Sequence, residues 1–166
     1  MRTLFAALVA LALLSAPAKA DIVEEVLGCK GDPCIVKENP GGKIKKFVEA
    51  ATAIALGDRS YVIIDGECAS ACTVLIDLIR NKVCLTSRAK LEFHRGTRSV
   101  SASVVMFPYT YKELIDLNYS REVDAWIRWK GGLPRDGSFI TMPIGVAQTI
   151  WSPCLPKGSH SVHGLY

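Results

Sequence analysis

The chain has 166 residues, of which 49% are hydrophobic and 22% are charged, a composition typical of a single globular domain. Its formal net charge is +4, from 20 Lys and Arg against 16 Asp and Glu, and it falls to +2 when Arg2 and Lys19 of the first segment are set aside. So small a charge gives no electrostatic basis for binding nucleic acid, and we expect no such partner.

Residues 1–20 have the pattern of a signal peptide. Arg2 supplies the positive start, residues 4–14 are almost entirely apolar, and Ala18 and Ala20 form a small-x-small cleavage site. The apolar run is shorter than the roughly 20 residues that a membrane-spanning helix needs. We therefore expect cleavage after Ala20 and a periplasmic or secreted protein. A retained interfacial anchor is the alternative.

The cysteines fit an exported protein. An even number in such a chain favours disulfides. The six are Cys29, Cys34, Cys68, Cys72, Cys84 and Cys154. Many pairings are possible, and spacing favours only Cys29 with Cys34, because a short loop joins them. A zinc site is the alternative, since Cys68 and Cys72 are close in sequence and His94 follows, but we expect no metal or other cofactor.

The predicted domain begins with strand, turn, helix and strand. Residues 35–37 are predicted to form a short strand that ends at the Gly41-Gly42 turn. Apolar residues spaced about three to four apart predict a helix over residues 43–56. The continuous β-branched run at residues 61–65 is typical of a buried parallel strand.

The same alternation continues after this strand. We expect a helix from Ser70 or Ala71 to Arg80, followed by strands at 82–86 and 90–94. Strands that alternate with helices in this way form right-handed crossovers. The sequence therefore predicts an α/β fold with a mostly parallel sheet flanked by helices.

The C-terminal part is less regular. It is predicted to contain a loop over the site at 95–107, a long helix at 109–130, a strand at 138–143, a short helix at 144–150 and a flexible tail at 153–166. This gives three parts: a signal peptide at 1–20, an α/β domain at 21–152 and the tail at 153–166.

Three features follow predicted strands of one sheet. Ser70 comes after a buried strand at the start of a helix, where free backbone N–H groups can face an anion. His94 ends another strand, and the Gly41-Gly42 turn ends a third. Each has an ordinary structural alternative: a helix cap for the serine, a strand-end histidine and a plain turn. Because the carboxyl ends of parallel strands meet at one edge, we expect the three to converge there.

These motifs resemble a known family. The segment 39–95 is similar to the proteolytic subunit of the Clp protease, ClpP, within the ClpP/crotonase superfamily. Order and spacing agree at four points: Asn39-Pro40-Gly41-Gly42, Gly66 to Ser70, Val83-Cys84-Leu85 and Phe93-His94. Almost the whole chain is similar to short exported ClpP-like proteins. The resemblance implies repeated ββα/βαβ units.

The resemblance also implies roles for site residues. Ser70 would be the nucleophile and His94 the general base, with the backbone N–H groups of Gly42 and Ala71 as the oxyanion hole. The third member of the triad would be Asp136.

Two observations bear on Asp136 as the acid of the triad. Arg135-Asp136 followed by Phe139 is similar to the family's pattern, although the interval from His94 is shorter. Asp124 is the alternative acid.

The expected function is that of an exported serine hydrolase, a peptidase acting on peptide or small ester or amide substrates. No ATPase partner is expected outside the cytoplasm, and a homo-oligomer is possible by resemblance. A catalytically inactive ClpP-fold binding or scaffold protein of the periplasm is the main alternative. A crotonase-type acyl-CoA enzyme is a third, and it gives Ser70 no role.

Overall fold

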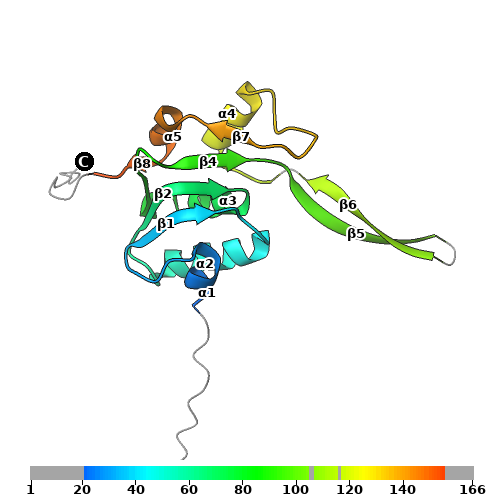
Figure 1. The fold of residues 1–166 in the computed structure, drawn as a ribbon, viewed down its shortest axis with the longest axis horizontal. Helices are drawn as coiled ribbons and strands as arrows, with labels where there is room; N and C mark the ends of the chain where they lie inside the picture. The colour runs from blue at the N-terminus through cyan, green and yellow to red at the C-terminus, as the bar shows by residue number, and fades with distance from the viewer. Residues whose placement is uncertain (1–20, 105–106, 116, 156–166) are drawn as a thin grey trace, which may run out of the picture.

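The computed structural model describes residues 21–104, 107–115 and 117–155. The predicted signal peptide and most of the predicted tail lie outside this part of the chain. Figure 1 shows a body built around one sheet, from which a long two-stranded ribbon extends.

The sheet of the body is mostly parallel, as predicted. Its strands are β1 (Cys34–Asn39), β2 (Val62–Ala69), β3 (Val83–Leu85), β4 (Lys90–Phe93), β7 (Ile140–Met142) and β8 (Ser152–Pro153). The central strand β2 pairs in parallel with β1, β3 and β4, and β3 pairs in parallel with β8. Among the described strands of this sheet, only β4 and β7 pair in antiparallel fashion. β1 and β4 flank the end of β2 that leads into the candidate site.

Helices flank the sheet, which confirms the coarse fold class. They are α1 (Ile22–Leu27), α2 (Ile44–Leu56), α3 (Ala71–Leu78), α4 (Arg121–Trp129) and α5 (Ile144–Ile150), with a 3₁₀ turn at Arg80–Lys82. In Figure 1, α1 and α2 lie on the β1 side, and α4 and α5 lie on the β4 side. The predicted helices at 43–56 and 144–150 are confirmed almost to the residue.

The core forms where the apolar patterns place it. On α2, the buried residues Phe47, Ala51 and Ile54 recur at helical spacing and face the interior. Val62 and Ile64 on β2 are completely buried, as the β-branched run predicted. The same cluster holds Leu91 and Phe93 of β4 and Trp151 after α5.

The predictions for residues 95–107 and 109–130 are wrong. Instead of a loop and a long helix, the chain forms an antiparallel pair, β5 (Gly96–Val104) and β6 (Phe107–Ile115). Of the described residues between 95 and 130, only those of α4 are helical. Small polar and apolar residues alternate from Ser99 to Val104, which is the period of a strand, and aromatic and β-branched residues follow in β6. Ser120 at the start of α4 is a typical N-cap residue type.

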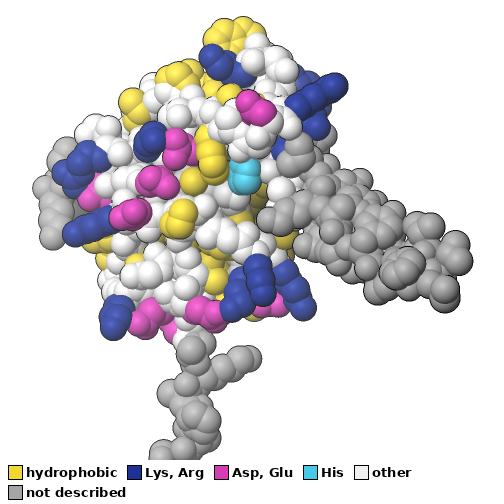
Figure 2. Space-filling model, turned by 45° about the vertical axis from the view of Figure 1, so that its right-hand side comes forward, with side chains coloured by type: hydrophobic (Ala, Val, Ile, Leu, Met, Phe, Trp, Pro, Cys, Tyr) yellow, Lys and Arg dark blue, Asp and Glu magenta, His cyan; other side chains and the backbone are white. Residues whose placement is uncertain are grey.

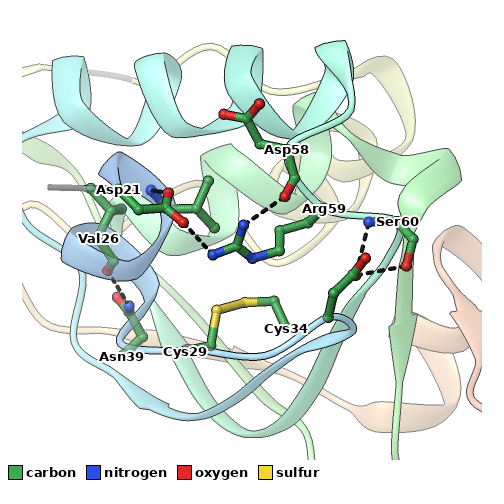
Figure 3. The surroundings of a disulfide bond; sticks show 10 residues. Asp21, Val26, Cys29, Cys34, Asn39, Asp58, Arg59 and Ser60 are labelled. Atoms are coloured by element: carbon green, nitrogen blue, oxygen red, sulfur yellow. Dashed lines mark hydrogen bonds and ion pairs between the residues drawn. A yellow bond between two sulfur atoms is a disulfide. The ribbon is translucent and has the colours of Figure 1, made fainter. Parts of the chain in front are cut away.

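Three disulfides are present: Cys29–Cys34, Cys68–Cys72 and Cys84–Cys154. The expected disulfide character and the one favoured pair are confirmed. Figure 3 shows the Cys29–Cys34 bond near the ion pair between Arg59 and Asp21.

The predicted boundary of the C-terminal tail lies too early. β8 is paired with β3, and Cys154 is bonded to Cys84, so the folded domain extends past residue 152. Within the described ranges, no helix has the length and apolar character to cross a membrane.

The contact between β1 and β2 at Gly66 gives a stability prediction. The register of the two strands shifts between Val36 and Glu38, and a Cβ on Gly66 would lie 1.9 Å from the Lys37 carbonyl oxygen. Gly66→Ala therefore forces the strands apart, and we expect it to lower the free energy of unfolding by about 2 kcal/mol in urea denaturation. Gly145→Ala in α5 meets no atom within 4 Å and is the control, expected to stabilise slightly. Equal destabilisation by both would contradict the contact.

Candidate active site

Ser70 and His94 are brought together at one edge of the sheet. The Ser70 Oγ lies 2.7 Å from the His94 Nε2, within the range for a nucleophile and its base. Ser70 lies between β2 and α3, and His94 follows β4 directly. β2 and β4 run in parallel with Ala69 opposite Glu92, so the two side chains leave the sheet side by side. The predicted convergence of the serine and the histidine is therefore observed.

The backbone of Ser70 is strained. Its φ of 55° and ψ of −123° make it the only non-glycine residue with positive φ in the described part of the chain. Such a conformation costs on the order of 1–3 kcal/mol and persists only where the surroundings fix it. A sharp turn of this kind between a strand and a helix exposes the hydroxyl of a nucleophile. The alternative role as a helix cap is not observed, because the Ser70 side chain makes no capping bond to α3.

A chain of hydrogen bonds holds the Ser70 carbonyl. Thr73, which is fully buried, donates from its Oγ1 to that carbonyl oxygen at 2.6 Å, and the Thr73 N–H donates to it at 3.0 Å. The Tyr119 hydroxyl lies 2.9 Å from the Thr73 Oγ1 and donates to it. Burial raises the pKa of Tyr119 to about 12, so this donor keeps its proton at neutral pH. Thr73 and Tyr119 were not among the predicted site residues.

The Gly41-Gly42 turn packs against Ser70. A Cβ on Gly41 would lie 2.6 Å from the Ala69 carbonyl oxygen and 2.7 Å from the Ser70 Cβ, so only glycine allows this approach. The buried Asn39 fixes the turn: its Oδ1 accepts from the Gly41 N–H at 3.0 Å.

Asn39 also ties the turn to the N-terminal helix. Its Nδ2 donates to the Val26 carbonyl at 2.7 Å, as Figure 3 shows. Asn39 lies opposite Cys68 in the pairing of β1 with β2, and this register places the Gly41-Gly42 turn next to Ser70.

One cavity of about 360 Å³ is lined by four of the predicted site residues. Ser70, His94, Gly42 and Ala71 all line it. Ile44 and Leu117 contribute apolar side chains to the same wall, and Lys43 lies beside Gly42. In Figure 2 the histidine side chain reaches the molecular surface among hydrophobic side chains. A carbonyl group bound here would meet the hydroxyl, the imidazole and the start of α3.

His94 contacts an aromatic ring. The centroid of the Phe139 ring lies 4.4 Å from that of His94, with the planes inclined by 38°. Burial lowers the pKa of His94, and within the described residues no carboxylate offsets this shift. The imidazole is therefore neutral near pH 7 and able to accept a proton.

The structure does not bring either predicted acid to His94. The exposed Asp136 accepts a hydrogen bond from the Ser138 N–H at 2.9 Å, and its bonds with Ser138 lower its pKa. Asp124, the alternative acid, pairs with Arg128 one turn later on α4. The expected role of Asp136 as a partner of His94 is therefore not seen in the geometry. The seven-residue interval from Gly132 to Ser138 contains no regular element to aim its side chain.

The zinc alternative finds no support in these contacts. Cys68 and Cys72 are bonded to each other, and the described residues contain no group of three or more His, Cys, Asp or Glu placed to hold a metal.

Comparison of the chain with known protein families, with curated proteins and with solved structures finds no significant match.

A pair of glycine substitutions tests the packing of the turn on Ser70. Gly41 and Gly28 both have positive φ, so alanine at either position costs on the order of 1–2 kcal/mol of strain. Only at Gly41 does the new Cβ also collide with Ser70 and Ala69, whereas at Gly28 it meets nothing within 4 Å. We expect Gly41→Ala to slow the labelling of Ser70 by a fluorophosphonate about 10- to 100-fold.

Gly28→Ala should leave the labelling rate unchanged while lowering the melting temperature. The same loss of labelling in both variants would mean that global destabilisation, and not the local collision, controls the serine.

Proposed function

We propose that this protein is an exported serine hydrolase of the ClpP-like type, acting on peptides or small esters and amides. The observation that carries the proposal is the 2.7 Å contact between the Ser70 Oγ and the His94 Nε2 at a strained turn. Ser70 is the nucleophile, His94 is the general base, and the Gly42 and Ala71 N–H groups are the oxyanion donors.

The reaction follows from these roles. His94 Nε2 takes the Ser70 proton as Oγ bonds to the substrate carbonyl carbon, and the carbonyl oxygen becomes an oxyanion facing the two backbone N–H groups. When the carbonyl re-forms, the bond to the leaving group breaks and His94 returns the proton to it. A water molecule, deprotonated by His94, then releases the acyl group from Ser70 and restores the serine.

Among the described residues, the proposed site is a serine–histidine pair with no carboxylate in contact with His94. Burial keeps His94 neutral, and the Phe139 ring limits the orientations of the imidazole. A carboxylate would also stabilise the imidazolium that forms during reaction, and its loss in a triad costs about 10⁴-fold in rate. We therefore propose a slow hydrolase and leave Asp136 outside the catalytic pair.

The same proposal includes the compartment in which the protein acts and its assembly into oligomers. Three disulfides fit an oxidising compartment, the periplasm or the exterior of the cell. No ATP-driven partner operates there. The resemblance to ClpP-like proteins extends the proposal to a homo-oligomer.

A catalytically inactive binding or scaffold protein of the same fold is the second candidate. It is favoured by one observation: within the described residues, no carboxylate contacts His94.

Covalent labelling separates the two candidates. The hydrolase should react once per chain with a fluorophosphonate, because an activated serine attacks phosphorus as it attacks a carbonyl. Ser70→Ala should abolish labelling, and Ser87→Ala, an exposed serine on the β3–β4 turn, should not change it. Intact-mass spectrometry measures the stoichiometry. No labelling of the unmodified protein at any pH from about 6 to about 9 would support the scaffold.

The pH dependence of labelling reports on His94. Protonated imidazole cannot accept the Ser70 proton, so the rate should rise with pH as His94 loses its proton. Because burial lowers the pKa of His94, the midpoint should lie below the ordinary value of about 6.5. Phe139→Ala exposes the ring to water and should move the midpoint upward. A midpoint above 6.5 in the unmodified protein would instead indicate a carboxylate beside His94.

A further inference from the structure

A disulfide closes the turn that carries the candidate nucleophile. Cys68 is the penultimate residue of β2, Cys72 is the second residue of α3, and Ser70 lies midway between them. We infer that the Cys68–Cys72 disulfide is a positioning device that holds Ser70 in its reactive conformation. This inference rests on the proposed function.

The bond acts on the one strained residue of the turn. Both cysteines are completely buried, and their Cα atoms lie 5.3 Å apart, so the strand end and the helix start are fixed close together. Within this closed turn, Ser70 has to bridge the two elements with a positive φ. Opening the link allows the ends to separate and Ser70 to relax to an unstrained backbone, which turns its hydroxyl away from His94.

Ser70 is also restrained by the packing of the Gly41-Gly42 turn and by hydrogen bonds. Its N–H donates to the Glu92 carbonyl at 2.9 Å, and its own carbonyl accepts from Thr73. The net contribution of such bonds is comparable to the strain that they oppose, because water replaces them when they open. Water cannot replace a covalent link in this way, so we expect loss of the disulfide to lower the fraction of chains in which Ser70 occupies the strained conformation.

The three disulfides differ in what they can do for stability. In the chain-entropy account, stabilisation grows with the length of the closed loop. Cys84–Cys154 spans 70 residues and ties the last strand to the sheet, whereas Cys68–Cys72 spans four. The Cys68–Cys72 bond is therefore the one expected to contribute least to global stability. Its position on either side of Ser70 points to a local effect on that residue.

Two double variants separate positioning from stability. Cys68→Ala/Cys72→Ala and Cys84→Ala/Cys154→Ala are compared with the unmodified protein in fluorophosphonate labelling, with the maximal rate and the half-saturating concentration measured separately, and in thermal unfolding. We expect the first variant to lose about 100-fold in maximal rate, with the half-saturating concentration within about twofold. Its melting temperature should fall less than that of the second variant. The second should keep its maximal rate within about threefold although it melts several degrees lower.

The outcomes distinguish this inference from the proposed function. If the unmodified protein shows no Ser70-dependent labelling, the hydrolase proposal fails, and this inference with it. If the unmodified protein is labelled and Cys68→Ala/Cys72→Ala is labelled at the same maximal rate, only the positioning role is overturned. A loss of rate that follows the melting temperature across both variants also overturns it. Cys68→Val/Cys72→Ala, which fills the vacated volume, replaces the alanine pair if that pair does not fold.

Discussion

The parallel pairing of β2 with β4 and β1 is the constraint on which the site depends. Parallel strands end at the same edge of a sheet, so residues that follow them become neighbours whatever their separation in sequence. Cys68 of β2 lies opposite Leu91 of β4 on one side and Asn39 of β1 on the other. That register alone brings a hydroxyl, an imidazole and a glycine turn to the rim of one cavity.

The second requirement is local and acts against the preferences of the chain. A serine with positive φ is held from three directions: by the glycine turn, by the hydrogen bonds from Thr73, and by the disulfide between its neighbours in the turn. The two cysteines and Thr73 lie within three residues of Ser70, but the glycine turn and the groups that bond to Ser70 and Thr73, the Glu92 carbonyl and the Tyr119 hydroxyl, come from distant parts of the sequence. The strain is therefore stored by tertiary structure rather than by any preference of Ser70 itself.

The parts of the fold that sequence could predict are those with one dominant pattern. The β-branched run of β2 and the apolar stripe of α2 each allowed a single interpretation, and both were right. The predictions of a loop at residues 95–107 and a helix at 109–130 were wrong, because a mixture of apolar and polar residues fits either a loosely amphipathic helix or a strand of a two-stranded ribbon. At the site, strand order sufficed to bring Ser70 and His94 together, but the geometry did not place Asp136 at His94. The position of Asp136 depends on an irregular segment whose course no periodicity encodes.

The strained backbone of Ser70 also helps to choose between the two proposed functions, hydrolase and scaffold. A scaffold that has lost the chemistry has no use for a serine in this conformation, since glycine takes the same φ and ψ without a steric penalty. Nor would it need the imidazole within hydrogen-bond distance of that hydroxyl, or a glycine turn so close that Gly41 admits no side chain. A nucleophile needs all three, because reaction requires an exposed hydroxyl, a base in contact with it and backbone donors opposite. Retaining an unfavourable backbone where glycine would be easier is what favours the hydrolase over the scaffold.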